Sequence, residues 1–204
     1  MTRARYALLG LIVILIMLSG HVCSAGTLTA FSDANDKWGY RDSSGKVVIA
    51  PQYSAAMEFS KQGIAAVVDE DGWLYIDKTG NPIVRPFVFD NGPDYFEDGL
   101  SRYVDNGKMG FINTSGKIVI PAAYDFARPF SEKRAAVCNG CRQEPEGEHK
   151  ITVGGKWGFI DQKGNVLIPL EYDGVSPFAD GRTEVNKDGR TFEIDSKGRE
   201  VKDK

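Results

Sequence analysis

The chain has 204 residues, 42% of them hydrophobic and 26% charged, and its formal net charge is −3. This length suits a single domain. A mildly acidic chain without a basic block is a poor match for nucleic acid or anionic lipid, so neither is expected as a main partner.

The first 25 residues have the pattern of a secretory signal peptide. Arg3 and Arg5 give a positive start, residues 7–18 are an apolar run, and small residues precede Gly26. The run is shorter than the roughly 20 apolar residues of a spanning helix, which favours cleavage over an uncleaved anchor. A lipoprotein signal would need Cys directly after Leu18-Ser19-Gly20, where the sequence has His21.

Residues 26–204 are therefore expected to form one exported repeat domain, periplasmic or extracellular, with no stable membrane span. Without the two Arg of the first 25 residues, 23 Lys and Arg face 28 Asp and Glu, giving a net charge near −5.

Five similar segments follow one another in this domain, with starts 35, 36, 48 and 34 residues apart. Each has a strand-forming stretch, then Asp or Asn, two polar residues and Gly, and in most copies an apolar run follows. Asp or Asn can bond its own backbone two residues on, and Gly takes the positive φ that closes the turn. Each segment is thus predicted to be a β-hairpin. The five cores are Trp38–Gly45, Trp73–Gly80, Met109–Gly116, Trp157–Gly164 and Thr191–Gly198.

A further apolar stretch precedes each core. In most copies a short turn-like segment joins this stretch to the core. Each unit is therefore predicted to be a three-stranded antiparallel meander. The preceding stretches are residues 28–31, 64–68, 100–104, 135–137 and 183–185.

The linkers between units carry pairs of aromatic residues about six positions apart, as in Tyr124…Phe130 and Tyr172…Phe178. These rings could hold a ligand, but the favoured interpretation is that they fill the gaps between successive sheets.

The pattern Trp-Gly-aromatic-Ile-Asp, then Gly-Lys-Ile-Val-Ile-Pro, Tyr-Asp and Pro-Phe resembles the WG (KWG) β-repeat family of bacterial proteins. The resemblance extends over residues 28–204, although Leu74 replaces the Gly of copy two and Met109 the Trp of copy three. It implies a non-catalytic β-repeat scaffold of propeller-like form, and it supplies no catalytic residues.

The fold class is accordingly all-β, with five tandem meanders. Strands such as residues 118–120 and 166–168 are apolar on both faces and need neighbouring sheets on both sides. A propeller-like ring and an open β-solenoid both provide this, and the ring is preferred.

One insert, residues 138–155, explains the 48-residue spacing and is predicted to extend a strand pair into a long hairpin. In an oxidising compartment, Cys138 and Cys141 favour a disulfide that would pin the tip of the insert. The alternatives are a metal site with His149 and one Glu, a thioredoxin-type redox pair, or two free thiols.

No motif of a known catalytic site occurs in residues 26–204, which contain one His. We expect no enzyme activity, cofactor or metal. The expected function is binding of an envelope protein or glycan, and the alternative is a secreted carbohydrate-active or redox enzyme. The candidate contacts lie in the insert: Arg142, Glu144, Glu146, Glu148 and His149.

Overall fold

The computed structural model describes residues 26–147 and 149–202, so the predicted signal peptide, residues 1–25, lies outside the described residues. Within the described part of the chain every regular element is a β-strand, and no helix long and apolar enough to cross a membrane is found there. The all-β prediction is confirmed.

The strands fall into five units that follow the predicted repeats. Units one and two contain β1 (Thr29–Ser32), β2 (Trp38–Arg41), β3 (Val47–Tyr53), β4 (Ala55–Ala56), β5 (Ile64–Asp69), β6 (Gly72–Asp77) and β7 (Pro82–Pro86). Unit three contains β8 (Val88–Phe89), β9 (Gly92–Pro93), β10 (Leu100–Asp105), β11 (Lys108–Asn113) and β12 (Ile118–Tyr124). Units four and five contain β13 (Phe126–Ala127), β14 (Arg134–Glu146), β15 (His149–Asp161), β16 (Val166–Tyr172), β17 (Gly174–Val175), β18 (Arg182–Lys187) and β19 (Arg190–Asp195).

Four units contain the predicted antiparallel meander, as β1–β2–β3, β5–β6–β7, β10–β11–β12 and β14–β15–β16. Unit five pairs β18 with β19, and its third strand is reduced to a bridge between Ile194 and Glu200. In units two, four and five, a two-residue strand from the linker also pairs with the first strand of the meander: β4 with β5, β13 with β14, and β17 with β18.

The five turns have the predicted structure. In the fourth copy, Asp161 Oδ1 accepts hydrogen bonds from the backbone N–H groups of Lys163 and Asn165, both at 2.8 Å. Gly164 has φ +86° and donates its N–H to the Asp161 carbonyl at 3.0 Å. Asn113 accepts the same two backbone hydrogen bonds in copy three. The turn therefore needs the side-chain oxygen and not its charge.

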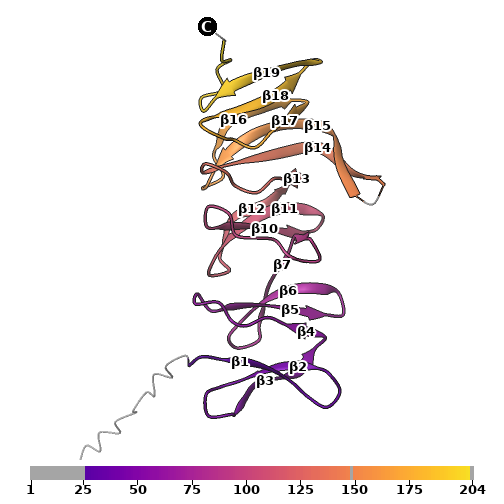
Figure 1. The fold of residues 1–204 in the computed structure, drawn as a ribbon, viewed down its shortest axis with the longest axis vertical. Coiled ribbons are helices and arrows are strands. Elements are labelled where there is room, and N and C mark those ends of the chain that lie inside the picture. Colours follow the sequence, from indigo (N-terminus) through magenta and orange to yellow (C-terminus); the bar gives the residue numbers. More distant parts are fainter. Residues whose placement is uncertain (1–25, 148, 203–204) are drawn as a thin grey trace, which may run out of the picture.

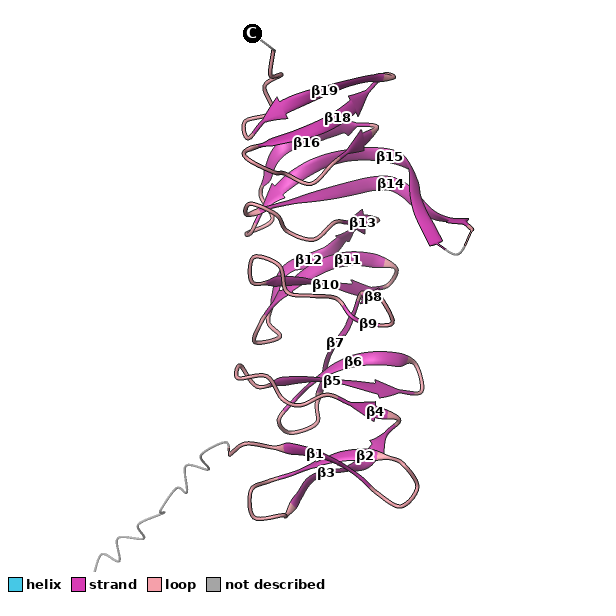
Figure 2. Cartoon of the chain, viewed as in Figure 1, coloured by secondary structure: helices cyan, strands magenta, loops and turns pink. Residues whose placement is uncertain are grey.

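The units stack in a line and do not form a closed ring (Figures 1 and 2). The expectation of a propeller-like ring is therefore wrong, and the open alternative describes the arrangement. The contact between units is repeated: Gly80, Gly164 and Gly198 each lie over an Ile of the preceding unit, namely Ile49, Ile120 and Ile168. A repeated heterologous contact closes a ring only when its rotations add up to a full turn, and here it generates a column.

Phe89 in the linker before β10 is exposed, but the second aromatic residue of every linker packs between the sheets, as the favoured interpretation predicted. Each packs against the aromatic residue of the preceding hairpin, with ring centroids 4.7 Å apart in the first pair and 4.8 Å apart in the third and fourth. The pairs are Tyr40–Phe59, Tyr75–Phe96, Phe111–Phe130 and Phe159–Phe178. These edge-on or tilted pairs fill the space between sheets.

The Gly of the Trp-Gly pair is required by a bulge in the next strand. A Cβ on Gly158 would lie 2.5 Å from the Ile168 carbonyl oxygen and 2.7 Å from the Leu170 nitrogen, because β16 skips residues between its pairings with Trp157 and Phe159. Unit two lacks this crossing. There β7 pairs with β6 only up to Val84, and Arg85 already pairs with Val104 of β10.

Two unusual features of unit two therefore have one cause. The early departure of β7 leaves room for Leu74 at the Gly position. It also joins units two and three into one seven-stranded sheet, in the order β12–β11–β10–β7–β6–β5–β4.

Candidate functional site

A cleft of about 1340 Å³ lies where the chain departs from its own repeat. One wall is the linker before β10, where the β8–β9 hairpin replaces the usual short strand. The other is the extended hairpin of β14 and β15, which projects from the side of the column (Figure 1). Residues that line the cleft include Phe87, Phe89, Tyr95, Phe126, Arg128 and Thr152.

The extended hairpin is the predicted insert, and its strands pair from Arg134 opposite Asp161 to Glu146 opposite His149. The ladder is interrupted once, at Gly140 and Gly155, both of which have positive φ. A Cβ on Gly155 would lie 2.6 Å from the Asn139 carbonyl oxygen. Only Gly fits this position, where the projecting ribbon leaves the sheet.

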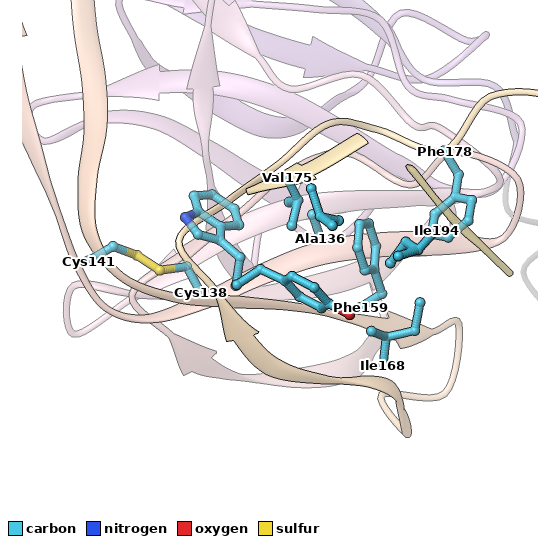
Figure 3. Close-up of a cluster of buried hydrophobic side chains, with 11 residues drawn as sticks. Ala136, Cys138, Cys141, Phe159, Ile168, Val175, Phe178 and Ile194 are labelled. Atoms are coloured by element: carbon cyan, nitrogen blue, oxygen red, sulfur yellow. A yellow bond between two sulfur atoms is a disulfide. The ribbon is translucent and has the colours of Figure 1, made fainter. Parts of the chain in front are cut away.

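Cys138 and Cys141 lie at this root as a disulfide-bonded pair, with Cα atoms 6.2 Å apart. Both are buried, in the cluster that includes Trp157 and Phe159 (Figure 3). The pair thus lies at the base of the insert, whereas the sequence analysis placed it at the tip. It links the ribbon to the core of unit four.

An ion pair forms the buried side of the cleft. Arg102 Nε lies 2.7 Å from Asp94 Oδ2, and Arg102 Nη2 lies 2.8 Å from Asp94 Oδ1. Arg102 also donates to the Ala127 carbonyl at 3.0 Å, and its guanidinium lies 4.3 Å from the centre of the Phe87 ring. The Arg102 guanidinium is therefore neutralised and hydrogen-bonded by groups of the protein itself.

Arg128 lies beside this pair and has no carboxylate partner in the part of the chain that the structure describes. Its guanidinium lies 5.4 Å from the centre of the Trp157 ring. Its Nε is buried and has no hydrogen-bond acceptor among the described residues. Burial, and then the charge of Arg102, lower the pKa of Arg128 below its usual value. Both effects disfavour an isolated charge here.

Apolar side chains remain exposed on the linker wall. Phe89 is 52% exposed, Tyr95 is 61% exposed, and their ring centroids are 6.2 Å apart. The β8–β9 hairpin that carries Phe89 is held by the Trp73 indole, which donates to the Asn91 carbonyl at 3.0 Å. The rings are therefore exposed on a supported loop, a combination typical of contact surfaces.

Of the insert residues chosen from the sequence, Arg142, Glu144 and Glu146 do not line this cleft. Gln143 and Thr152, which are hydrogen-bonded to each other, line it together with Lys150. Side chains alternate along a strand, so Arg142 and Glu144 lie on the opposite face, where they form an exposed ion pair at 2.7 Å. Glu146 is exposed near the tip, the backbone of His149 lies opposite it, and Glu148 lies outside the described residues.

The role of those five residues in binding stays a prediction. The described residues contain no group of three or more His, Cys, Asp or Glu that could hold a metal ion. The cleft residues Phe89, Tyr95 and Arg128 were missed because they occupy linkers, which looked purely structural. The sequence feature that could have pointed to this linker is the irregular spacing of its aromatic residues between Phe89 and Phe96.

Comparison with known proteins agrees with the repeat found in the structure. The family described as "WG containing repeat" matches residues 38–73, 75–108, 109–140 and 157–190. No curated protein matches the chain. The four matches begin at β2, leave out residues 141–156 and end in unit five, and together they span most of the chain. The chain therefore belongs to the WG-containing repeat family.

Proposed function

We propose that this protein is a non-catalytic binding module of the bacterial cell envelope, and that its cleft receives a segment of a partner protein. The observation that carries the proposal is the position of the cleft. It lies where the two irregular parts of the repeat array meet, and exposed aromatic residues line it.

The repeated residues are already used by the fold. The turn carboxylates bind their own backbone, the paired aromatic residues fill the core, and the Trp-Gly glycines accommodate bulges. In repeat proteins, departures from the repeat often carry the binding function. The β8–β9 hairpin and the long β14–β15 hairpin are such departures, and they are contributed by different units.

The chemistry of the cleft supports binding rather than catalysis. Asp94 is fully engaged by Arg102, and the other carboxylates on the cleft, Asp90 and Glu97, are exposed. Aromatic residues and Arg are the side chains enriched in protein interfaces. The signal-like start of the sequence and the paired cysteines support export.

Site-specific photo-crosslinking in envelope extract tests the proposal. A photoreactive amino acid replaces Phe89, and the control replaces Val166, which is 55% exposed at a position outside the cleft. We expect a discrete cross-linked protein from position 89 that is absent from position 166. Identical products from both positions, or none from position 89, would overturn the proposal. A product that a glycosidase removes would identify a glycan as the partner instead.

A further inference from the structure

We propose that the cleft recognises a peptide carboxylate flanked by apolar side chains, and that Arg128 is the residue that binds it. This inference rests on the proposed function, because it specifies the chemistry of the segment that the cleft receives. It starts from the unequal surroundings of the two arginines in the cleft.

The guanidinium of Arg102 has both a carboxylate partner and hydrogen-bond acceptors, whereas that of Arg128 has neither among the described residues. Arg102 has two bonds to Asp94 and one to a backbone carbonyl. Arg128 has no ion pair and no side-chain hydrogen bond among the described residues, and its Nε is shielded from water. A buried donor without an acceptor is costly, and so is a cation beside another cation. A ligand that supplies an anion would offset the charge penalty.

The position of Arg128 suits a carboxylate. The guanidinium carbon of Arg128 lies over the Trp157 ring, 5.4 Å from its centre, and this cation–π contact does not use the N–H groups of the guanidinium. The planar fork of Arg matches the two oxygens of a carboxylate, which gives short and directional bonds. The exposed rings of Phe89 and Tyr95 provide apolar contacts in the same cleft.

The exposed carboxylates of the cleft favour a single anionic group. Asp90 and Glu97 also line the cleft, are exposed and have no ion pair in the described structure, and Lys150 adds one further cation to the lining. They would repel a polyanion such as a nucleic acid or a highly charged polysaccharide, but not one carboxylate placed at Arg128. The cleft volume also exceeds the range of about 300–1,000 Å³ usual for small molecules, which favours a polypeptide segment.

Arg134 provides a matched control. Like Arg128, it lies over an aromatic ring, with its guanidinium 5.1 Å from the centre of Phe178, and its Nε is buried without an acceptor in the described structure. Unlike Arg128, it does not line the cleft, and it donates to the Glu132 carbonyl at 2.9 Å. A substitution of Arg134 therefore measures the effect of losing an arginine that lies over an aromatic ring outside the cleft.

The experiment is a selection from a random peptide phage library on residues 26–204 with the cysteine pair intact. We expect enrichment of Asp or Glu next to apolar residues. A selected peptide is then synthesised with Glu or Gln, and with a free or amidated C-terminus, so that the side-chain and terminal sources of the carboxylate are separated. The carboxylate form is expected to bind about tenfold or more tightly than the neutral form.

The preference for the carboxylate should disappear in Arg128→Gln, persist partly in Arg128→Lys, and remain unchanged in Arg134→Gln. Equal binding of Glu and Gln peptides, or a preference retained in Arg128→Gln, would overturn the inference. If such peptides nevertheless lose affinity in Phe89→Ala, the binding module stands and only its acid specificity fails. Binding of polygalacturonate that depends on Arg128, without enrichment of any peptide, would also overturn it and would indicate an acidic glycan.

Discussion

Asp94 and Arg102 form an ion pair that is almost completely removed from water, with side chains 3% and 5% exposed. Asp94 closes the linker hairpin by donating its N–H to the Phe87 carbonyl at 2.9 Å, and Arg102 lies on β10. The pair therefore fixes the aromatic wall of the cleft to the central sheet. It also provides the most direct test of the structure around the site.

Removing one member of this pair should strongly destabilise the protein. Asp94→Asn leaves the Arg102 charge buried without its partner, and we expect a loss of about 3–5 kcal/mol in the free energy of unfolding. Urea denaturation measures this. The exposed pair of Arg142 and Glu144 is the control, because Glu144→Gln should change stability by less than about 1 kcal/mol. Similar losses of unfolding free energy in both variants would contradict the burial of the ion pair between Asp94 and Arg102.

Removing the charge of Arg128, in contrast, should not destabilise the protein. Arg128→Met keeps the apolar part of the side chain and removes an unpaired charge next to Arg102, so we expect a melting temperature equal to or above that of the unmodified protein. Calorimetry measures the melting temperatures of the two variants Arg128→Met and Arg102→Met, and only Arg102→Met should be destabilised. A large loss of stability in Arg128→Met would mean that its charge is already compensated within the fold.

Gly158→Ala should destabilise the protein by roughly 1–3 kcal/mol, because the added methyl would meet the backbone of β16. Gly174→Ala is the matched control: an added Cβ there would meet only Asn186 Cβ, at an ordinary 3.8 Å, and the φ of Gly174 is not positive. Chemical denaturation should show little change for Gly174→Ala. Equal effects at both positions would contradict the account of the bulge.

The hairpin turns should make the protein sensitive to acid. Bonds from the side chain and then the backbone N–H of Arg199 lower the pKa of Asp195 to about 2, and the Asn165 side chain is the main cause of the lowered pKa of Asp161. A pKa below that of the unfolded chain stabilises the fold above about pH 4, and this contribution is lost as the pH falls toward about 2.

The variant Asp161→Asn with Asp195→Asn keeps a turn oxygen but cannot titrate, as Asn113 illustrates in copy three. We expect its free energy of unfolding to fall less steeply between about pH 4 and pH 2. Denaturation curves over this range provide the measurement. Parallel pH profiles for the variant and the unmodified protein would contradict the prediction.

The cysteine pair should be oxidised in protein recovered from the cell envelope. Intact mass before and after reduction should differ by two hydrogen atoms, and the double variant Cys138→Ala with Cys141→Ala should lose about 2 kcal/mol, the value expected for a very short loop. Because the pair lies at the root of the ribbon, we also expect reduction to increase hydrogen exchange in residues 141–155. An unchanged mass on reduction would show free thiols.

The hairpins and meanders could be predicted from the sequence because their determinants are local. The oxygen of Asp161 and the positive φ of Gly164 act within a few residues, and the same pattern occurs in all five copies. The choice between a ring and a column could not be predicted. It depends on small rotations between units, which follow from contacts such as Gly164 with Ile120.

The site was harder to predict than the fold. Leu74 was noted as a departure from the family pattern, but its consequence, the pairing of β7 with β10, is visible only in three dimensions. The closeness of Cys138 to Cys141 and the long hairpin were predicted correctly. The cleft was not, because Phe89, Arg128 and Thr152 come from three separate segments whose proximity is set by the stacking of units three and four.

The pairing of β7 with β10 also has a mechanical consequence. The described chain begins at one end of the column and ends at the other, so a force applied through its ends loads the sheets in series (Figure 1). Units two and three share one sheet through the pairing of β7 with β10, whereas units one, four and five each have a sheet of their own. Under tension the junction between units two and three therefore differs from the others, because separating these units requires breaking a strand pairing within one sheet.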